Sequence, residues 1–297
     1  MTQKISVVIN TFNEEANMEK AIKSVSWADE TIICDMHSGD NTVAIAKKLG
    51  AKIFFHEQVD YVEPARNFAI SQATGDWILV LDADERIPQT LAKRLQEIAA
   101  NMKQISSVKL PRKNIIFGKW MKTSMWWPDY QIRFFKAGKV KWRNEIHSKP
   151  EIEGGSIDLE PEEKWALIHY NYNNLSQYIG RMNRYTDIEA KELINNGYKF
   201  CWQDIIQKPL SEFLSRFFAG RGFEDGLHGL ALSMLQAFSF LAVYLKVWEI
   251  EKFGQQELNL EELEIIKNKG GRELNYWFKK SGSNGNIFKS FLKKFNN

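Results

Sequence analysis

Three carboxylates stand close together directly after an apolar run. Residues 77–81 read Trp-Ile-Leu-Val-Leu, and Asp82, Asp84 and Glu85 follow at once. Like charges at this spacing repel one another and lose hydration beside a protein interior. A solvated loop after a strand is the plain explanation. A divalent cation, Mg²⁺ or Mn²⁺, is the sharper one, because both ions take carboxylate oxygens as ligands.

The spacing of Asp82 and Asp84 allows the two side chains different tasks. Asp84 can bind the ion, whereas Asp82 can reach a ribose hydroxyl or the water shell of the ion. Mg²⁺ usually keeps several waters and shares its site with substrate phosphates. Asp-x-Asp by itself is common in turns, so its position after a buried strand is what makes it informative.

The elements that must position these residues alternate along the first hundred positions. Strands are predicted at 5–9, 30–35, 51–55 and 76–82, and helices at 14–25, 41–50, 64–75 and 88–100. Pro64 begins the helix at 64–75 and Gly75 ends it, and Gly50 ends the helix at 41–50. Apolar strands separated by crossover helices predict an α/β fold with a doubly wound, mostly parallel sheet.

Polar clusters follow three of these strands. Residues 10–15 follow the first strand, residues 35–40 the second, and residues 82–85 the fourth. In open parallel sheets, ligands bind outside the carboxyl ends of the strands. We therefore expect the three clusters to form one ligand site.

Composition excludes several classes of protein. The chain has 297 residues, 44% of them hydrophobic, which is enough for a sizeable core, and a net charge of +3 argues against nucleic-acid binding. Cys34 and Cys201 give no disulfide framework and fit a reduced cytoplasmic compartment. The first residues lack the pattern of a signal peptide. No Gly-x-Gly-x-x-Gly, Walker A or zinc-spaced Cys/His motif is present.

Beyond residue 105 the pattern becomes irregular and rich in aromatic residues, which suggests short strands and loops. From about residue 175 it is helical. Residues 279–286, rich in Ser, Gly and Asn, form the only predicted linker.

Three ordered stretches, residues 7–25, 30–46 and 65–85, resemble the inverting nucleotide-sugar glycosyltransferases of family 2, which have the GT-A fold. More loosely, residues 128–142, 145–150 and 166–185 are similar to the branch that glucosylates lipopolysaccharide core. Many relatives in that branch read Val-His-Glu where this chain reads Ile146-His147-Ser148, so one carboxylate of their pattern is missing.

The resemblance implies a donor that is a nucleotide-diphosphate sugar, such as a UDP-hexose, and roles for residues of the three clusters. In the first two loops, the nucleotide pocket would be lined by Thr11, Asn13 and Glu14 or Glu15, Asp35 would accept from the imide N–H of the base, and Ser38 and Asp40 would shape the second loop. Arg66 would approach the base or the diphosphate. Asp82 would touch the ribose, and Asp84 would bind the metal.

Plainer roles are available for several of these residues. Asn13 and Asp40 can cap the helices that follow them. Asp35 can close an ordinary turn after its strand. Arg66 can pair with Glu63 at the surface.

Single inversion at the sugar requires one general base and no enzymatic nucleophile. The donor bond breaks through an oxocarbenium-like state, as in glycoside chemistry. The attacking hydroxyl has a pKa far above 7, so a carboxylate must take its proton. Asp129 is the first candidate and Glu145 the second; alternatively, Asp129 pairs with Arg133. His169 is either a further metal ligand or a hydrogen-bonded core residue.

The C-terminal third suggests membrane contact. Residues 226–245 carry no Asp, Glu, Lys or Arg, and either dip into one leaflet as a hairpin, lie at the interface or form a core helix. In residues 286–295, three Phe fall on one helical face with Lys beside it, a pattern that suits an anionic inner leaflet. We expect a protein at the cytoplasmic face of the plasma membrane with a glycolipid or oligosaccharide acceptor.

The expected organisation has four parts. They are a nucleotide-sugar-binding half at 1–100 and an acceptor-side half at 101–175, together a GT-A catalytic domain, then a helical extension at 176–278 and a basic tail at 279–297.

Two other functions compete with that of a glycosyltransferase. A nucleotidyltransferase would want a Gly-rich, Lys-bearing first loop, whereas this loop is acidic. A non-catalytic nucleotide-sugar-binding protein would fit the departure at Ser148.

Overall fold

The computed structural model describes residues 3–58, 63–142 and 150–282. The chain forms two compact units. The first contains residues 1–115 and 127–171, and the second contains residues 116–126 and 172–297. The short segment 116–126 thus belongs with the C-terminal helices, although the sequence around it suggested a place in the catalytic domain.

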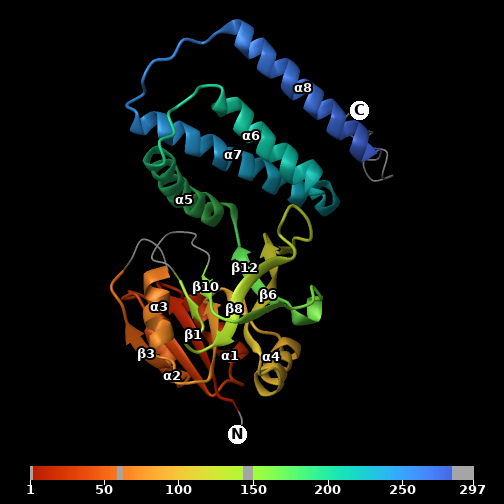
Figure 1. Ribbon diagram of the computed structural model, residues 1–297. Coiled ribbons are helices and arrows are strands. Elements are labelled where there is room, and N and C mark those ends of the chain that lie inside the picture. The colour runs from red at the N-terminus through yellow and green to blue at the C-terminus, as the bar shows by residue number, and fades with distance from the viewer. Residues whose placement is uncertain (1–2, 59–62, 143–149, 283–297) are drawn as a thin grey trace. The chain divides into compact units, whose positions relative to one another are not determined.

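The first unit is built on a mixed sheet with the strand order β3-β2-β1-β4-β8-β6-β12-β5 (Figure 1). Its parallel half consists of β1 (Ile5–Thr11), β2 (Glu30–Asp35), β3 (Lys52–Phe55) and β4 (Trp77–Asp82), which alternate with α1 (Glu15–Ser24), α2 (Thr42–Lys48), α3 (Glu63–Ser71) and α4 (Gln89–Asn101). These bounds confirm the predicted α/β pattern to within a few residues.

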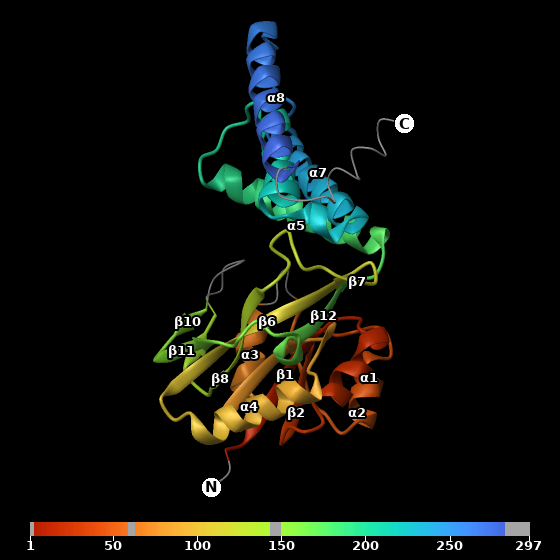
Figure 2. The same ribbon diagram turned by 90° about the vertical axis from the view of Figure 1, so that its right-hand side faces the viewer.

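Strand β1 shows why the apolar runs are continuous. Val7 and Ile9 face one cluster, in which Met18 of α1 and Leu91 of α4 are buried. Val8 faces the opposite cluster, which contains Ala65 of α3. Helices cover both faces of the parallel half, and α1 and α2 lie side by side (Figure 2). A strand that is buried on both faces therefore reads as a nearly continuous apolar run.

The other half of the sheet is mixed. It contains β5 (Glu85–Arg86), β6 (Ile105–Ile116), β8 (Asp129–Lys136) and β12 (Leu167–Tyr172), and the shorter β7 (Lys119–Trp120) and β11 (Gly155–Asp158) pair with β6. Strands β9 (Val140–Lys141) and β10 (Glu151–Ile152) form a separate two-stranded sheet. Our expectation of only short strands after residue 105 was wrong for β6, which has 12 residues. Polar residues of β6 and β8 line the site described below, so neither strand reads as an apolar run.

The second unit is helical. It contains α5 (Leu175–Asn195), α6 (Asp204–Leu214), α7 (Leu227–Ile250) and α8 (Leu260–Gly282). Asn174 begins α5, because its side chain accepts from the backbone N–H of Gln177 at 2.8 Å. Asp225 fixes the segment 116–126, accepting at 3.0 Å and 2.9 Å from the backbone N–H groups of Lys122 and Thr123.

Helix α7 contains the uncharged stretch. It is one continuous helix, so the hairpin alternative was wrong. By length and composition it could cross a membrane, with a mean hydropathy of 1.7 over its most apolar window. One side packs within the unit, with Leu232 and Val247 fully buried, whereas Met234 and Phe238 are 55% and 51% exposed. It is therefore a core helix on one side and an apolar surface on the other.

The predicted linker 279–286 is wrong in its first half, because α8 continues through Gly282 and buries Ser281. Its second half and the Phe/Lys stretch 286–295 lie outside the described residues.

Candidate active site

The carboxyl ends of three parallel strands bring the polar clusters together. Asn10 of β1 is paired in register with Asp82 of β4, and Thr11 with Asp35 of β2. Because neighbouring parallel strands end at one edge of a sheet, the loops that follow them leave from the same place. The first loop, the second loop and residues 82–85 thus meet, as a single ligand site requires.

The first and second loops are hydrogen-bonded to each other. The backbone N–H of Asn13 donates to Ser38 Oγ at 2.8 Å, and Gly39 N–H donates to Asn13 Oδ1 at 2.8 Å. The backbone N–H of Glu15 donates to Asp40 Oδ2 at 3.0 Å. Asn13 has a φ of 55°, a left-handed conformation that Asn tolerates better than most residues. Hydrogen bonds therefore tie the two loops together.

Asp40 and Asp35 hold the second loop in shape. Asp40 Oδ1 accepts from the backbone N–H of Thr42, the first residue of α2, at 3.0 Å. Asp35 is fully buried, and its two oxygens accept from Ser38 N at 2.8 Å and Ser38 Oγ at 2.6 Å. In this structure the Asp35 carboxylate closes its own turn, which is the plainer of the two roles expected for it.

Polar and aromatic groups gather at the end of β1 and in the loop that follows it. Among the described residues, neither the buried amide of Asn10 nor the buried hydroxyl of Thr11 has a hydrogen-bond partner. Phe12, between the strand and the loop, is 37% exposed. Glu14 accepts from Asn17 Nδ2 at 2.8 Å. Buried polar groups without partners are rare, and at a strand end they mark a place for a polar ligand or ordered water.

Arginines account for much of the carboxylate cluster. Arg133 Nη2 donates to Asp82 Oδ2 and, at 2.8 Å, to Glu85 Oε1. Arg66 Nη2 lies 3.3 Å from Asp82 Oδ1, and Arg112 Nη1 lies 3.6 Å from Glu85 Oε1. The alternative pairing of Arg133 with Asp129 was wrong, because Arg133 contacts the other two carboxylates.

The same arginines set the ionisation of Asp82. Burial alone would raise the pKa of this carboxyl, but the charges of Arg133, Arg66 and Arg112 hold the pKa well below its usual range. Burial alone would lower the pKa of Arg133, but the charges of Asp82 and Glu85 outweigh burial and raise the pKa above its usual value. Asp82 and Arg133 are therefore both charged at neutral pH.

Arg66 lies beside Asp82 in the site. Its guanidinium lies over the ring of Trp142, 5.4 Å from the ring centroid, in addition to its contact with Asp82. The side chain of Glu63, the alternative partner, lies outside the described residues.

Asp129 is held by donors on both of its oxygens. Arg112 Nε and Nη2 donate to Oδ2 at 2.8 Å and 2.6 Å, Asn114 Nδ2 donates to Oδ2 at 3.0 Å, and Gln131 Nε2 donates to Oδ1 at 2.9 Å. Burial would raise the pKa of Asp129, but Arg112 and these hydrogen bonds lower it. A lowered pKa makes a carboxylate a weaker proton acceptor. The geometry favours an orienting role for Asp129. Glu145 lies outside the described residues.

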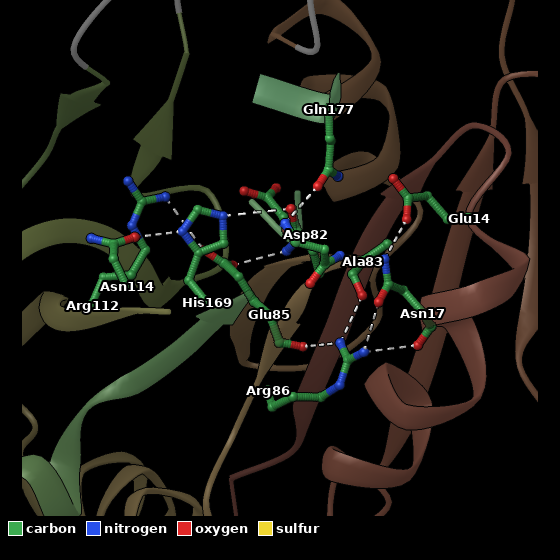
Figure 3. A network of polar contacts seen from close by, with 12 residues as sticks. Glu14, Asn17, Asp82, Ala83, Glu85, Arg86, Arg112, Asn114, His169 and Gln177 are labelled. Carbon is green, nitrogen blue, oxygen red and sulfur yellow. Dashed lines mark hydrogen bonds and ion pairs between the residues drawn. The ribbon is translucent and has the colours of Figure 1, made fainter. Parts of the chain in front are cut away.

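Asp84 and His169 are brought together by strand pairing. Residue 169 of β12 is paired with Glu85 of β5, and the backbone N–H of Tyr170 donates to the Asp84 carbonyl at 2.9 Å. His169 Nε2 lies 3.5 Å from Asp84 Oδ2. On the other side of the ring, Nδ1 lies 2.6 Å from Asn114 Oδ1 (Figure 3). The two side chains that the sequence suggested as metal ligands are thus neighbours.

This pair fits a cation that is shared with a substrate. Among residues 3–58, 63–142 and 150–282, no group of three or more His, Cys, Asp or Glu is arranged to hold an ion. One carboxylate and one imidazole leave most of a cation's coordination positions to water or to phosphate oxygens, as at many nucleotide sites.

Arg86 fixes the backbone on both sides of Asp84. Its Nη1 donates to the carbonyls of Ala83 and Glu85 at 2.7 Å and 2.6 Å, and its Nη2 donates to the carbonyl of Asn17 in α1 at 3.1 Å (Figure 3). Arg86 is 9% exposed. It joins the loop that bears Asp84 to the helix that follows the first loop.

Four residues of the site were not among those expected from the sequence: Arg86, Arg112, Asn114 and Arg133. The alternation of side chains along a strand could have indicated three of them, Arg112, Asn114 and Arg133. Side chains two apart in a strand share a face, which places Arg112 with Asn114 on β6 and Asp129, Gln131 and Arg133 together on β8. Polar residues at every second position of a buried strand indicate a polar site on that face.

Comparisons with known proteins agree with this architecture. Residues 6–151 match the model of glycosyl transferase family 2. An uncharacterised glycosyltransferase of Rickettsia typhi is 32% identical over 84% of this chain and 88% of its own length. The lipopolysaccharide core biosynthesis glycosyltransferase LpsC of Rhizobium meliloti is 24% identical, over 82% of this chain and 92% of its own.

Among solved structures, glucosyl-3-phosphoglycerate synthase from Mycobacterium tuberculosis, in a crystal with phosphoglyceric acid, is similar with a TM-score of 0.43 and 17% identity. That match covers 66% of this chain and 80% of the synthase. The family model and the Rickettsia relative define the class: this chain is a glycosyltransferase. It belongs to glycosyltransferase family 2 and has the GT-A fold, followed by a helical C-terminal region.

Proposed function

We propose that the protein is a metal-dependent, inverting hexosyltransferase that uses a UDP-hexose donor and a glycolipid or polysaccharide acceptor such as lipopolysaccharide core. The observation that carries the proposal is the adjacency of Asp84 Oδ2 and His169 Nε2, 3.5 Å apart, at the carboxyl edge of the parallel strands. Two such groups side by side suit a shared divalent cation.

The donor set favours Mn²⁺ over Mg²⁺, because Mg²⁺ prefers oxygen ligands alone. Asp84 and His169 would hold the ion, which when bound supplies positive charge to stabilise the leaving diphosphate. Arg133 and Arg66 keep Asp82 ionised as an acceptor for a ribose hydroxyl. The buried amide of Asn10, the Thr11 hydroxyl and the exposed ring of Phe12 offer polar and stacking contacts to the nucleotide.

Proton removal from the acceptor hydroxyl falls to Glu145 in this proposal. A general base works best when its pKa lies near the working pH, and the donors around Asp129 move its pKa in the opposite direction. A single displacement from the face opposite the leaving diphosphate then inverts the anomeric centre.

The proposed acceptor is membrane-linked, and the enzyme would act at the cytoplasmic face of the plasma membrane. The similarity to LpsC supports a core oligosaccharide acceptor. The exposed apolar side chains of α7, Met234 and Phe238 among them, support contact with lipid. The Phe and Lys side chains of residues 286–295 would add attraction to an anionic leaflet.

A panel of nucleotide sugars tests this function. The protein is incubated with each donor, with Mn²⁺ or Mg²⁺, and with truncated lipopolysaccharide, and the product linkage is determined by NMR. We expect an inverted product from a UDP-hexose, with Mn²⁺ more effective than Mg²⁺. Asp84→Ala should abolish transfer, whereas Asp158→Ala, at an aspartate that is 49% exposed and paired with Lys109, should not. Tight UDP binding without transfer to any acceptor would instead identify a non-catalytic binding protein.

A further inference from the structure

A chain of hydrogen bonds runs from Asp129 through Asn114 to His169. We infer that Asn114 and Asp129 are positioning residues that hold His169 as the tautomer with its proton on Nδ1, which directs the Nε2 lone pair toward Asp84. The inference rests on the proposed function in one respect, which is that the Nε2 lone pair serves to bind the metal.

Asn114 has one orientation that satisfies both of its neighbours. It is fully buried on β6, with Nδ2 3.0 Å from Asp129 Oδ2 and Oδ1 2.6 Å from His169 Nδ1. An ionised carboxylate only accepts hydrogen bonds, so the NH₂ group of Asn114 must face Asp129. The amide oxygen is then turned to the imidazole, and the nitrogen it meets must carry the proton.

Asp129 is itself prevented from donating or turning. Arg112 binds Oδ2, the oxygen that Asn114 also meets, through two N–H groups. A guanidinium has no acceptor and remains charged. The orientation of the carboxylate is thereby fixed, and the fixed carboxylate in turn fixes the amide of Asn114.

At the other end of this series of hydrogen bonds, His169 faces the carboxylate of Asp84. With its proton on Nδ1, the neutral imidazole of His169 presents a lone pair at Nε2, 3.5 Å from Asp84 Oδ2. Two lone pairs at this separation suit a cation held between or beside them. Hydrogen bonds from the second nitrogen of a metal-bound histidine are the usual means of selecting its tautomer, and their loss typically lowers metal affinity about 10- to 100-fold.

The tautomer can be measured directly in the metal-free protein. Nitrogen-15 NMR of labelled histidine distinguishes an Nδ1–H from an Nε2–H imidazole, and the His169 signals are identified by their loss in His169→Gln. At about pH 8.5, where a free imidazole is neutral, we expect His169 in the wild-type protein to carry its proton on Nδ1. A wild-type signal showing the proton on Nε2 would overturn the inference without any variant.

Variants then test the two positioning residues. Asp129→Asn keeps the shape of the side chain but adds an NH₂ donor, so Asn114 can face either way and both tautomers should appear. Asn114→Ala removes the acceptor and should have the same effect. Gln131→Ala removes a different donor to Asp129 and is the matched control, with the tautomer expected to be unchanged. An unaltered tautomer in both Asp129→Asn and Asn114→Ala would refute the positioning role.

Metal affinity separates this inference from the proposed function. Titration with Mn²⁺ and UDP, followed by electron paramagnetic resonance, should show about 10- to 100-fold weaker Mn²⁺ binding in Asp129→Asn and Asn114→Ala than in Gln131→Ala. If the tautomer is as expected but Mn²⁺ leaves the His169 signals of the wild-type protein untouched, the metal assignment of the proposed function fails and the hydrogen-bonded chain stands.

Discussion

Replacing Arg133 by Met should destabilise the first unit more than removing either carboxylate that it binds. Arg133 and Glu85 are 4% and 0% exposed, and their side chains meet at 2.8 Å. Removing one member of a buried pair leaves the other desolvated and uncompensated, at a cost of about 3–5 kcal/mol. Glu85→Gln should reduce the free energy of unfolding by less, because both arginines retain a carboxylate partner. Arg133 remains paired with Asp82, and Arg112 remains paired with Asp129.

A double-mutant cycle measures this coupling. The free energy of unfolding is obtained from urea denaturation of the wild-type protein, Arg133→Met, Glu85→Gln and the double variant. Because a neutral amide at position 85 no longer needs a cation, the double variant should be destabilised less than the sum of the single variants, by about 2–3 kcal/mol. The difference should persist in high salt, since buried charges are poorly screened. Additive effects would refute the view that Arg133 holds the carboxylates together.

Three further outcomes are expected. Glu145→Gln should abolish transfer yet spare UDP binding, measured by calorimetry; full activity in that variant would remove Glu145 as the base. Burial would raise the pKa of Glu30, but hydrogen bonds from Lys52, Ser6 and Thr74 outweigh it and lower the pKa from 4.5 to about 2. The Glu30 carboxylate therefore stabilises the fold fully above about pH 4.5, and this stabilisation is lost as the pH falls to 2. In urea unfolding, the difference in free energy of unfolding between wild type and Glu30→Gln should shrink by about 3 kcal/mol over that range. A difference that stays constant with pH would contradict this. Deleting residues 283–297 should weaken binding to anionic vesicles, measured by flotation, chiefly at low salt; unchanged flotation would exclude the tail as an anchor.

The parallel half of the sheet could be predicted because its signals are local. Apolar runs such as residues 77–81 are buried on both faces, and the helices between them follow within a few residues. The edge at which ligands bind follows from the same pattern, since neighbouring parallel strands end together. Thr11, Asp35 and Asp82 were placed at that edge correctly for this reason.

The mixed half could not be predicted in the same way, because its chemistry depends on pairings between distant strands. Arg112 lies opposite Asp129 only through the antiparallel register of β6 and β8, and His169 lies beside Glu85 only through β12 and β5. No local pattern states which strand will be the neighbour. Sequence reasoning therefore found Asp84 and His169 separately but missed Asn114, which links His169 to Asp129.

The arginines change the meaning of the carboxylate cluster that follows the fourth strand. A cluster held together by a metal alone would be unstable without it, because like charges would repel. Here Arg133 binds Asp82 and Glu85, and Arg86 fixes the carbonyls on both sides of Asp84. The loop is therefore in place before any ligand arrives, which saves the ordering that binding would otherwise require. It follows that Asp84→Ala should leave the fold intact, whereas Arg133→Met should not.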